Sequence, residues 1–295
     1  MDLFLGNGEI FAIAAALCWS IGTFLFGAVS RRVNSFVINL LASASGLVLQ
    51  IAIISLFGDF SKFLVIDLKI FGLIALIALT GYVIGRTLYL ESLKLVGVSV
   101  TLPLTSIQPL FTFVLALIFL GEVVTPVVLL ATVIIIAGVW MINNQKITDK
   151  TERQKFRRGV TLGLAASVLW SLTPIVVSYL LAYIDVIYLN SARIMIQIVM
   201  LSIILLTQGK FSELFKLGRQ DIIPISLGGF FTYFFSVTFF MMSISMIGVS
   251  NATPLARIYP LFGFFLAILF LKEKFTYVKL MGTVAVVLGV LLITF

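Results

Sequence analysis

Three arginines lie inside stretches of apolar sequence, where a charged side chain is unusual. Arg86, Arg193 and Arg257 each fall within a run long enough to cross a lipid bilayer. A cation at that depth is costly and by default marks a function or a buried partner. A guanidinium carries parallel N–H donors that match the oxygens of a carboxylate or a phosphate. The three arginines therefore predict a site for an anion or for the carboxylate end of a zwitterion.

The residues around Arg86 favour this interpretation. Tyr82, Arg86 and Tyr89 share one helix face and are candidates for substrate binding. Glu91 is the one acid well inside an apolar run, but it lies five residues after Arg86 and so about 140° around the helix. We therefore expect no simple ion pair between the two, and Glu91 remains the candidate for proton coupling.

Arg193 belongs to a polar stripe, with Asn190 three residues before it and Gln197 four residues after it. These side chains share a helix face and are further candidates for substrate binding. A structural role is the alternative. Arg193 would then extend to the membrane interface, and Arg86 and Arg257 would donate to backbone carbonyls freed by nearby prolines.

Two Trp-Ser pairs occupy equivalent positions, at Trp19 and at Trp170. Each tryptophan is about eleven residues into its predicted helix, roughly 16 Å along the axis, and so near the middle of the membrane. Tryptophan usually lies at the membrane interface instead. Both are therefore candidates for a cavity wall, with simple packing as the alternative. Asn39, the equivalent of Asn190, is also a candidate for substrate binding.

Four prolines form two equivalent pairs, each with a spacing of six residues: Pro103, Pro109, Pro254 and Pro260. Pro109 and Pro260 are expected in helix interiors, where each frees the carbonyl four residues before it. Such breaks are tolerated where protein or a watery cavity satisfies the carbonyl. The prolines are therefore candidates for hinges or gates, and a packing kink without ligand contact is the alternative.

Composition indicates that a membrane protein positions these side chains. The chain of 295 residues is 61% hydrophobic and 11% charged, with a mean hydropathy of +1.20. It contains no histidine and one cysteine, Cys18, which excludes His-based catalysis, His-ligated zinc and a His-ligated haem within one chain. We expect no cofactor and no metal.

The apolar runs predict an all-α polytopic membrane protein with ten transmembrane helices. Their approximate ranges are 9–29, 35–57, 69–93, 98–120, 125–142, 159–181, 187–207, 220–246, 250–271 and 277–294. The motif Gly-Val-Ser at 97–99 and at 248–250 predicts a glycine helix stop followed by a serine N-cap.

The chain contains an internal repeat with a constant offset of 151 residues. Residues 97–122 and 248–273 are identical at 15 of 26 positions. We expect a first five-helix repeat at 1–145, a basic cytoplasmic linker at 146–158 and a second repeat at 159–295. Because five is odd, the second repeat must enter the membrane from the opposite side, so the repeats are inverted. The three arginines have no arginine at the equivalent positions, which suggests that function has broken the symmetry.

The charges of the predicted loops indicate an orientation. Loops on one side carry fourteen Lys and Arg residues and loops on the other side carry two. Because Lys and Arg accumulate on the cytoplasmic side, we expect an integral protein, of the plasma membrane, with both termini outside.

The repeats resemble the EamA-type members of the drug/metabolite transporter superfamily over essentially the whole chain. The residues that carry the resemblance are "CWSIGT" and "LWSLTP", the helices "PLFTFVLALIFLGE" and "PLFGFFLAILFLKE", and a glycine in each final span. The resemblance implies a ten-helix permease with a central cavity, which moves small metabolites by alternating access. It also implies both termini in the cytoplasm, the alternative to the orientation that the charges favour.

The competing interpretation is a membrane protein that does not transport, either a lipid-modifying enzyme or a scaffold. The sequence contains no interfacial His/Asp cluster and no acidic metal-binding motif, and a scaffold does not need three arginines within its spans. We therefore expect a transporter rather than an enzyme. Its expected partners are a small-molecule substrate and the bilayer, with no nucleic acid, and the sequence leaves monomer and homodimer open.

The orientation can be tested by labelling intact cells with an impermeant maleimide. Cys18 is replaced with Ala, and a single cysteine is added near residue 152 or at the C-terminus. With both termini outside, the C-terminal cysteine is labelled and the cysteine near residue 152 is not. Strong labelling near residue 152 with none at the C-terminus would reverse the assignment.

Overall fold

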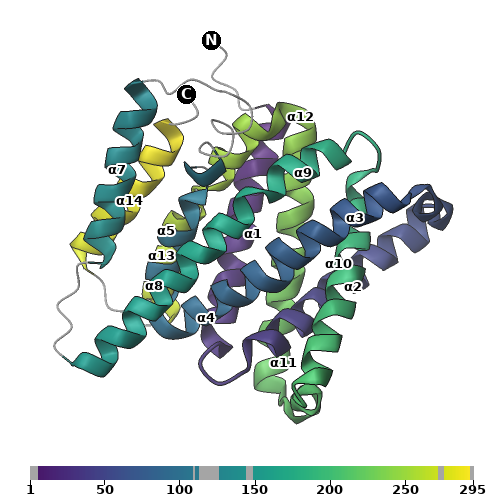
Figure 1. Cartoon of the computed structure of the whole chain (residues 1–295), viewed down its shortest axis with the longest axis horizontal. Helices are drawn as coiled ribbons and strands as arrows, with labels where there is room; N and C mark the ends of the chain where they lie inside the picture. The colour runs from purple at the N-terminus through teal and green to yellow at the C-terminus, as the bar shows by residue number, and fades with distance from the viewer. Residues whose placement is uncertain (1–5, 109, 113–125, 144–148, 272–275, 293–295) are drawn as a thin grey trace.

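A computed structural model describes residues 6–108, 110–112, 126–143, 149–271 and 276–292, and all of their regular structure is helical (Figure 1). Within these ranges six helices are long and apolar enough to cross a membrane. The expected spans 98–120 and 125–142 border or include residues outside the described ranges, so the count of ten remains a prediction.

The elements of the first half are α1 (Asn7–Val29), α2 (Ser35–Phe57), η1 (Phe60–Val65), α3 (Leu68–Ile77), η2 (Ala78–Gly85), α4 (Arg86–Val96), α5 (Val98–Ser106) and α7 (Pro126–Asn143). The second half contains α8 (Lys150–Ser171), α9 (Thr173–Leu180), α10 (Val186–Thr207), η3 (Phe211–Lys216), α11 (Arg219–Gly229), η4 (Phe230–Ser236), α12 (Val237–Ala256), α13 (Tyr259–Leu271) and α14 (Tyr277–Leu292). The segments η1 and η3 are 3-10 helices, and η2 and η4 are π-helices.

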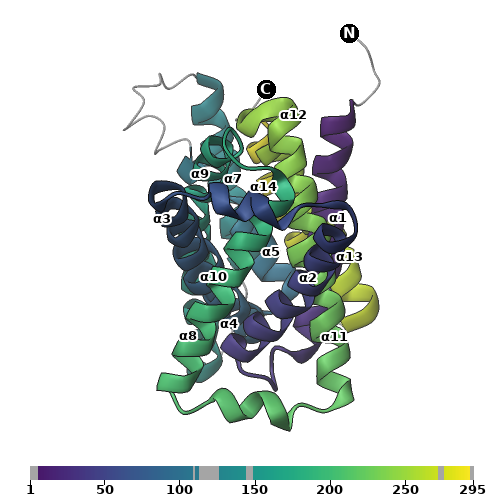
Figure 2. The same cartoon turned by 90° about the vertical axis from the view of Figure 1, so that its right-hand side faces the viewer.

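The two halves run in opposite directions through the bundle. In Figures 1 and 2, α1 descends from the N-terminal end, and in Figure 1 its counterpart α8 begins at the lower end and ascends. Residues 150–158, expected in the linker, form the first turns of α8, because Asp149 caps that helix by accepting from the Glu152 N–H at 2.8 Å.

The helices of the two repeats are intermixed in one bundle and do not form two separate units. Helix α1 contacts α12 and α13 of the second repeat, and α8 contacts α4 and α5 of the first. Helices α7 and α14 form a pair at one edge (Figure 1), where Gly138 and Gly289 let the backbones approach. A Cβ on Gly138 would lie 2.7 Å from the carbonyl oxygen of Gly282, and glycine avoids this clash because it has no Cβ.

Glycine ends α4, as the sequence predicts. Gly97 has φ 79° and the equivalent Gly248 has φ 77°, a conformation that glycine adopts without strain. The predicted serine cap is wrong for the first copy, because α5 begins at Val98 and Gly97 itself is the N-cap residue. The chain reverses at this glycine.

Pro260 is not in a helix interior. It is the second residue of α13, where its missing N–H costs no hydrogen bond. The chain breaks just before it, because α12 ends at Ala256 and Arg257 and Ile258 form a turn. Pro109 lies outside the described residues.

The π-helices η2 and η4 occupy equivalent positions. In each repeat, an asparagine from another helix of the same repeat donates to a backbone carbonyl of the π-helix. A π turn leaves backbone carbonyls unsatisfied, and such turns are frequent at functional sites. Asn39 donates to the carbonyl of Tyr82 at 2.8 Å, and Asn190 donates to the carbonyl of Tyr233 at 2.9 Å. Because a membrane interior offers no water to these carbonyls, the two asparagines stabilise both segments.

Arg193 is fully buried beside these asparagines. Its Nε and Nη2 donate to Oδ1 of Asn190 at 3.1 and 2.5 Å, and its Nη1 donates to Oε1 of Gln197 at 2.8 Å. The guanidinium carbon lies 3.6 Å from the centre of the Tyr82 ring. The hypothesis that Arg193 extends to the membrane interface is wrong, because its side chain is 0% exposed. Neutral oxygens and an aromatic ring compensate its charge instead.

Replacement of Asn190 with Leu tests this cluster. The substitution leaves two Arg193 donors without a partner, which costs about 1–3 kcal/mol for each buried polar group, and it removes the shorter of the two hydrogen bonds to the Tyr233 carbonyl, which Gln50 also contacts at 3.3 Å. We expect the midpoint of thermal unfolding in detergent to fall by several degrees. Ile203→Leu, on the exposed side of the same helix, is the control and leaves it unchanged. Equal midpoints for the two variants would contradict the structural role of Asn190.

Candidate functional site

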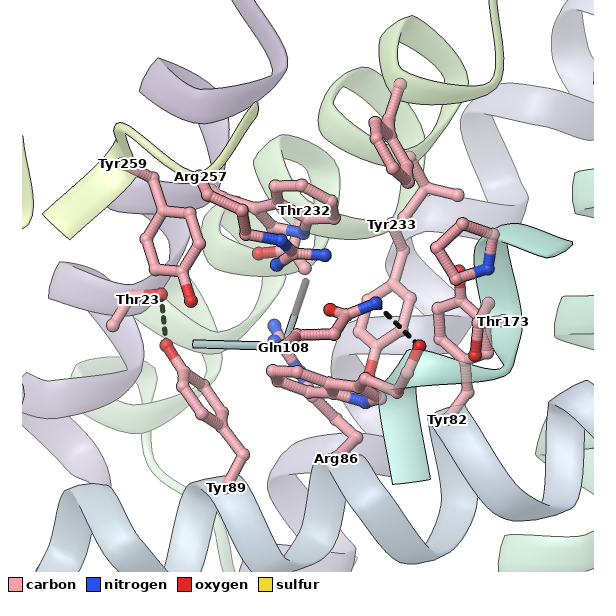
Figure 3. Close-up of a pocket in the computed structure, with 15 residues that line it drawn as sticks. Thr23, Tyr82, Arg86, Tyr89, Gln108, Thr173, Thr232, Tyr233, Arg257 and Tyr259 are labelled. Atoms are coloured by element: carbon pink, nitrogen blue, oxygen red, sulfur yellow. Dashed lines mark hydrogen bonds between the residues drawn. The ribbon is translucent and has the colours of Figure 1, made fainter. Parts of the chain in front are cut away.

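A cavity lies between the two repeats, in the middle of the bundle (Figure 3). It contains about 620 Å³ of space that protein atoms do not fill, including space continuous with solvent. Its lining residues come from both repeats: Trp19, Thr23, Tyr82, Arg86, Tyr89, Gln108, Trp170, Thr173, Pro174, Thr232, Tyr233, Val237, Phe240, Arg257 and Tyr259.

Twelve of these residues form six pairs with the repeat offset of 151: Trp19 with Trp170, Thr23 with Pro174, Tyr82 with Tyr233, Arg86 with Val237, Tyr89 with Phe240, and Gln108 with Tyr259. Equivalent positions of the two repeats therefore line the same cavity. The residue equivalent to Arg86 is the apolar Val237, so the members of a pair can share position but differ in chemistry. The site is symmetric in its frame and asymmetric in its charge.

Arg86 begins α4 directly after the π-helix η2 and is 5% exposed. Its guanidinium carbon lies 5.2 Å from the ring centre of Phe26, 4.9 Å from that of Tyr89 and 5.4 Å from that of Tyr233. These rings stabilise the cation through their faces. Its Nε and Nη2 have no hydrogen-bond partner among the described residues, so two buried donors are available to a ligand.

Arg257 lies at the break between α12 and α13, so the interrupted helix aims a guanidinium into the cavity (Figure 3). It is 5% exposed, and its guanidinium carbon lies 5.3 Å from the Trp19 ring and 5.7 Å from the Tyr259 ring. Within the part of the chain that the structure describes, its Nε has no hydrogen-bond partner. Among the described residues, neither Arg86 nor Arg257 forms an ion pair.

Hydrogen bonds between elements fix other parts of the wall. Nε1 of Trp170 donates to the carbonyl of Gly81 in η2 at 2.7 Å, and the Trp170 carbonyl accepts from the Gln108 amide at 2.6 Å. The hydroxyls of Thr23 and Tyr89 are 2.5 Å apart. Figure 3 marks the Thr23 and Gln108 bonds. A wall held in this way is preorganised for a ligand.

Six of the side chains that the sequence singles out for binding line this cavity: Trp19, Tyr82, Arg86, Tyr89, Trp170 and Arg257. The other four, Asn39, Asn190, Arg193 and Gln197, lie behind the wall in the buried polar cluster. They contact two residues of the cavity wall, Tyr82 and Tyr233. The asparagines donate to the backbone carbonyls of these tyrosines, and Arg193 lies over their rings.

Three of the remaining candidates, Glu91, Pro103 and Pro260, are not among the described lining residues. Glu91 accepts a hydrogen bond from the Ser35 hydroxyl at 2.7 Å, at the start of α2. Pro103 is inside α5, Pro254 is in α12, and Pro260 follows the break that carries Arg257. The hinge and proton-coupling roles of these residues remain predictions.

The sequence analysis missed the rest of the lining, although the repeat offset contains the signal. Tyr82 and Tyr89 are candidates, and adding 151 gives Tyr233 and Phe240, which both line the cavity. No comparable signal identifies Thr173 or Thr232, because their equivalents are Gly22 and Gly81.

Known proteins resemble this chain over almost its whole length. The pattern of the EamA-like transporter family matches residues 6–144 and 157–295. A protein of Archaeoglobus fulgidus described as an uncharacterized transporter is 22% identical, and the match covers 96% of each chain. A solved structure described only as the crystal structure of a protein shares the fold, with a TM-score of 0.68, 14% identity, and 97% of this chain and 96% of that chain covered.

These matches confirm the resemblance noted in the repeats and indicate a membrane transporter rather than an enzyme. Two copies of the family pattern agree with the internal duplication, and the apolar helices agree with an integral membrane protein. The chain belongs to the EamA-like transporter family, within the drug/metabolite transporter superfamily.

Proposed function

We propose that this protein is a secondary transporter that moves a small organic solute with an anionic group across the membrane by alternating access. The observation that carries the proposal is the pair of buried guanidiniums in a cavity between the repeats, each with at least one N–H donor that has no partner among the described residues. A buried donor without a partner is costly, so such groups persist where a ligand satisfies them.

The position of the cavity supports a transport cycle. In transporters built from inverted repeats, the substrate binds near the middle of the membrane, at the repeat interface and beside interrupted helices. Arg257 lies at such an interruption, and Arg86 follows a π-helix. Movement of one repeat against the other would open this cavity alternately to the two sides.

An ion pair joins the two repeats at each of two separate contacts. Arg32 pairs with Asp221 at 2.5 Å, and Lys62 pairs with Asp185 at 2.7 Å. The hydrogen bond to Asp185 raises the pKa of Lys62 above its ordinary value of 10.5, so the lysine is charged at neutral pH. Both cations are about half exposed, and exposed ion pairs are weak. Such contacts can break and reform as the repeats move.

We further propose the plasma membrane as the location, with both termini outside. The basic segments 30–34, 208–218 and the start of α8 lie at the lower end of the bundle in Figure 1, whereas α1 begins and α14 ends at the upper end. Positive charge at the lower end favours that end as the cytoplasmic one.

Uptake into reconstituted vesicles tests the transport function. The panel comprises labelled carboxylates, phosphorylated metabolites, amino acids and organic cations. Saturable uptake of a solute with an anionic group is expected. Uptake of cations alone, or no difference from empty vesicles for any solute, would contradict the proposal.

Arg257 variants test the role of the cavity in that uptake. Arg257→Gln removes the positive charge and the guanidinium N–H donors. Hydrogen bonds to charged groups contribute about 1.5–3 kcal/mol, so uptake should fall about tenfold to a hundredfold. Arg257→Lys should lose less but remain impaired, because an ammonium is a point charge. Arg31→Gln, which removes an exposed arginine, is the matched control and should transport normally. Wild-type uptake by Arg257→Gln would remove Arg257 from the binding site.

A further inference from the structure

The cavity lining has an imbalance of charge that narrows the class of substrate. Among the residues that the structure describes, the lining contains two arginines and neither aspartate nor glutamate. Charges repel more strongly in a protein interior than in water, because the surroundings screen them less. A substrate with an ammonium group would place a third cation beside Arg86 and Arg257, with no carboxylate in the lining to compensate it.

Aromatic rings are the other groups that bind an ammonium, but most rings of this cavity already face a guanidinium. Arg86 lies over Tyr89 and Tyr233, and Arg257 lies over Trp19 and Tyr259. From behind the wall, Arg193 lies over the Tyr82 ring. Of the seven aromatic side chains in the lining, Trp170 and Phe240 alone have no such guanidinium among the described contacts. Five of the seven rings therefore already contact a guanidinium of the protein itself.

The unpaired atoms of the cavity point the same way. Nε and Nη2 of Arg86 and Nε of Arg257 are donors without a partner. The unpaired atoms that can accept are neutral: Oε1 of Gln108 and the hydroxyls of Thr173 and Thr232. An anion satisfies all three charged donors, whereas an ammonium finds no charged acceptor.

We propose that the substrate of this cavity is an organic anion that has no ammonium group, and that a dianion binds more tightly than a monoanion. The inference rests on the proposed transport function and narrows it, because it rejects zwitterionic amino acids as preferred substrates. A flat apolar body suits the aromatic wall, and two negative charges match the two guanidiniums.

Binding of four ligands with the same phenyl ring tests the proposal on the purified full-length protein in detergent. The ligands are benzylmalonate, 3-phenylpropionate, phenylalanine and phenethylamine, which at mildly alkaline pH are a dianion, a monoanion, a zwitterion and a cation. Trp19 and Trp170 report binding by fluorescence, since both line the cavity. Trp140 is 64% exposed on α7, so Trp140→Phe removes a background signal without altering the site.

We expect phenylpropionate to bind at least about tenfold more tightly than phenylalanine, and benzylmalonate about threefold more tightly again. Phenethylamine should not bind. Partition of the ligands into the detergent favours the less charged ligand of each pair, so it predicts the opposite order for the two anions. Arg86→Gln and Arg257→Gln should each remove the preference for benzylmalonate over phenylpropionate, while Arg31→Gln should retain it.

Phenylalanine or phenethylamine binding as tightly as phenylpropionate would overturn the inference, and so would failure of both anions to bind. These results are distinct from failure of the proposed function. If vesicles take up phenylalanine and Arg257→Gln abolishes that uptake, the cavity is a transport site for a zwitterion and only the anion selectivity is wrong.

Discussion

The structure depends on how three arginines are accommodated in an apolar bundle in which, among the described residues, none of them forms an ion pair. The donors of Arg193 are taken by neutral oxygens, and its guanidinium lies over the rings of Tyr82 and Tyr233. Arg86 and Arg257 lie over the faces of aromatic rings, and each still has at least one N–H donor without a partner among the described residues. Aromatic faces stabilise a cation without consuming its N–H groups. The protein can therefore hold two charges in its interior while leaving their hydrogen-bonding capacity to a ligand.

Gene duplication explains how such a site acquires its frame. The equivalent pairs Asn39 with Asn190 and Tyr82 with Tyr233 make the same contact in each repeat, an asparagine amide on the carbonyl of a π-helix. These contacts hold the segments that carry Tyr82, Arg86 and Tyr233. Arg86 and Arg257, one from each repeat, line the cavity and have no arginine at the equivalent positions, so a symmetric scaffold carries an asymmetric charge.

The sequence predicts much of this organisation, because apolar length, helical spacing and the offset of 151 are local or repetitive properties. It places Tyr82, Arg86 and Tyr89 on one face, and all three line the cavity. It cannot separate Arg193 from Arg257, because both are single arginines in apolar runs. What distinguishes them is whether Asn190 and Gln197 accept their donors, a matter of rotamers and packing. The spacing of residues in the sequence also does not predict the π-helices, because tertiary contacts such as the hydrogen bond from the Asn39 amide stabilise them.

The central claim is that Arg86 and Arg257 together hold the anionic group of a ligand between the repeats. The most direct measurement is a structure of the protein with 3-(4-bromophenyl)propionate, in which the bromine identifies the orientation of the ring. The account predicts carboxylate oxygens within about 3 Å of nitrogens of both guanidiniums, with the ring against the aromatic wall. A carboxylate bound away from both arginines, or a ligand outside the cavity, would contradict it.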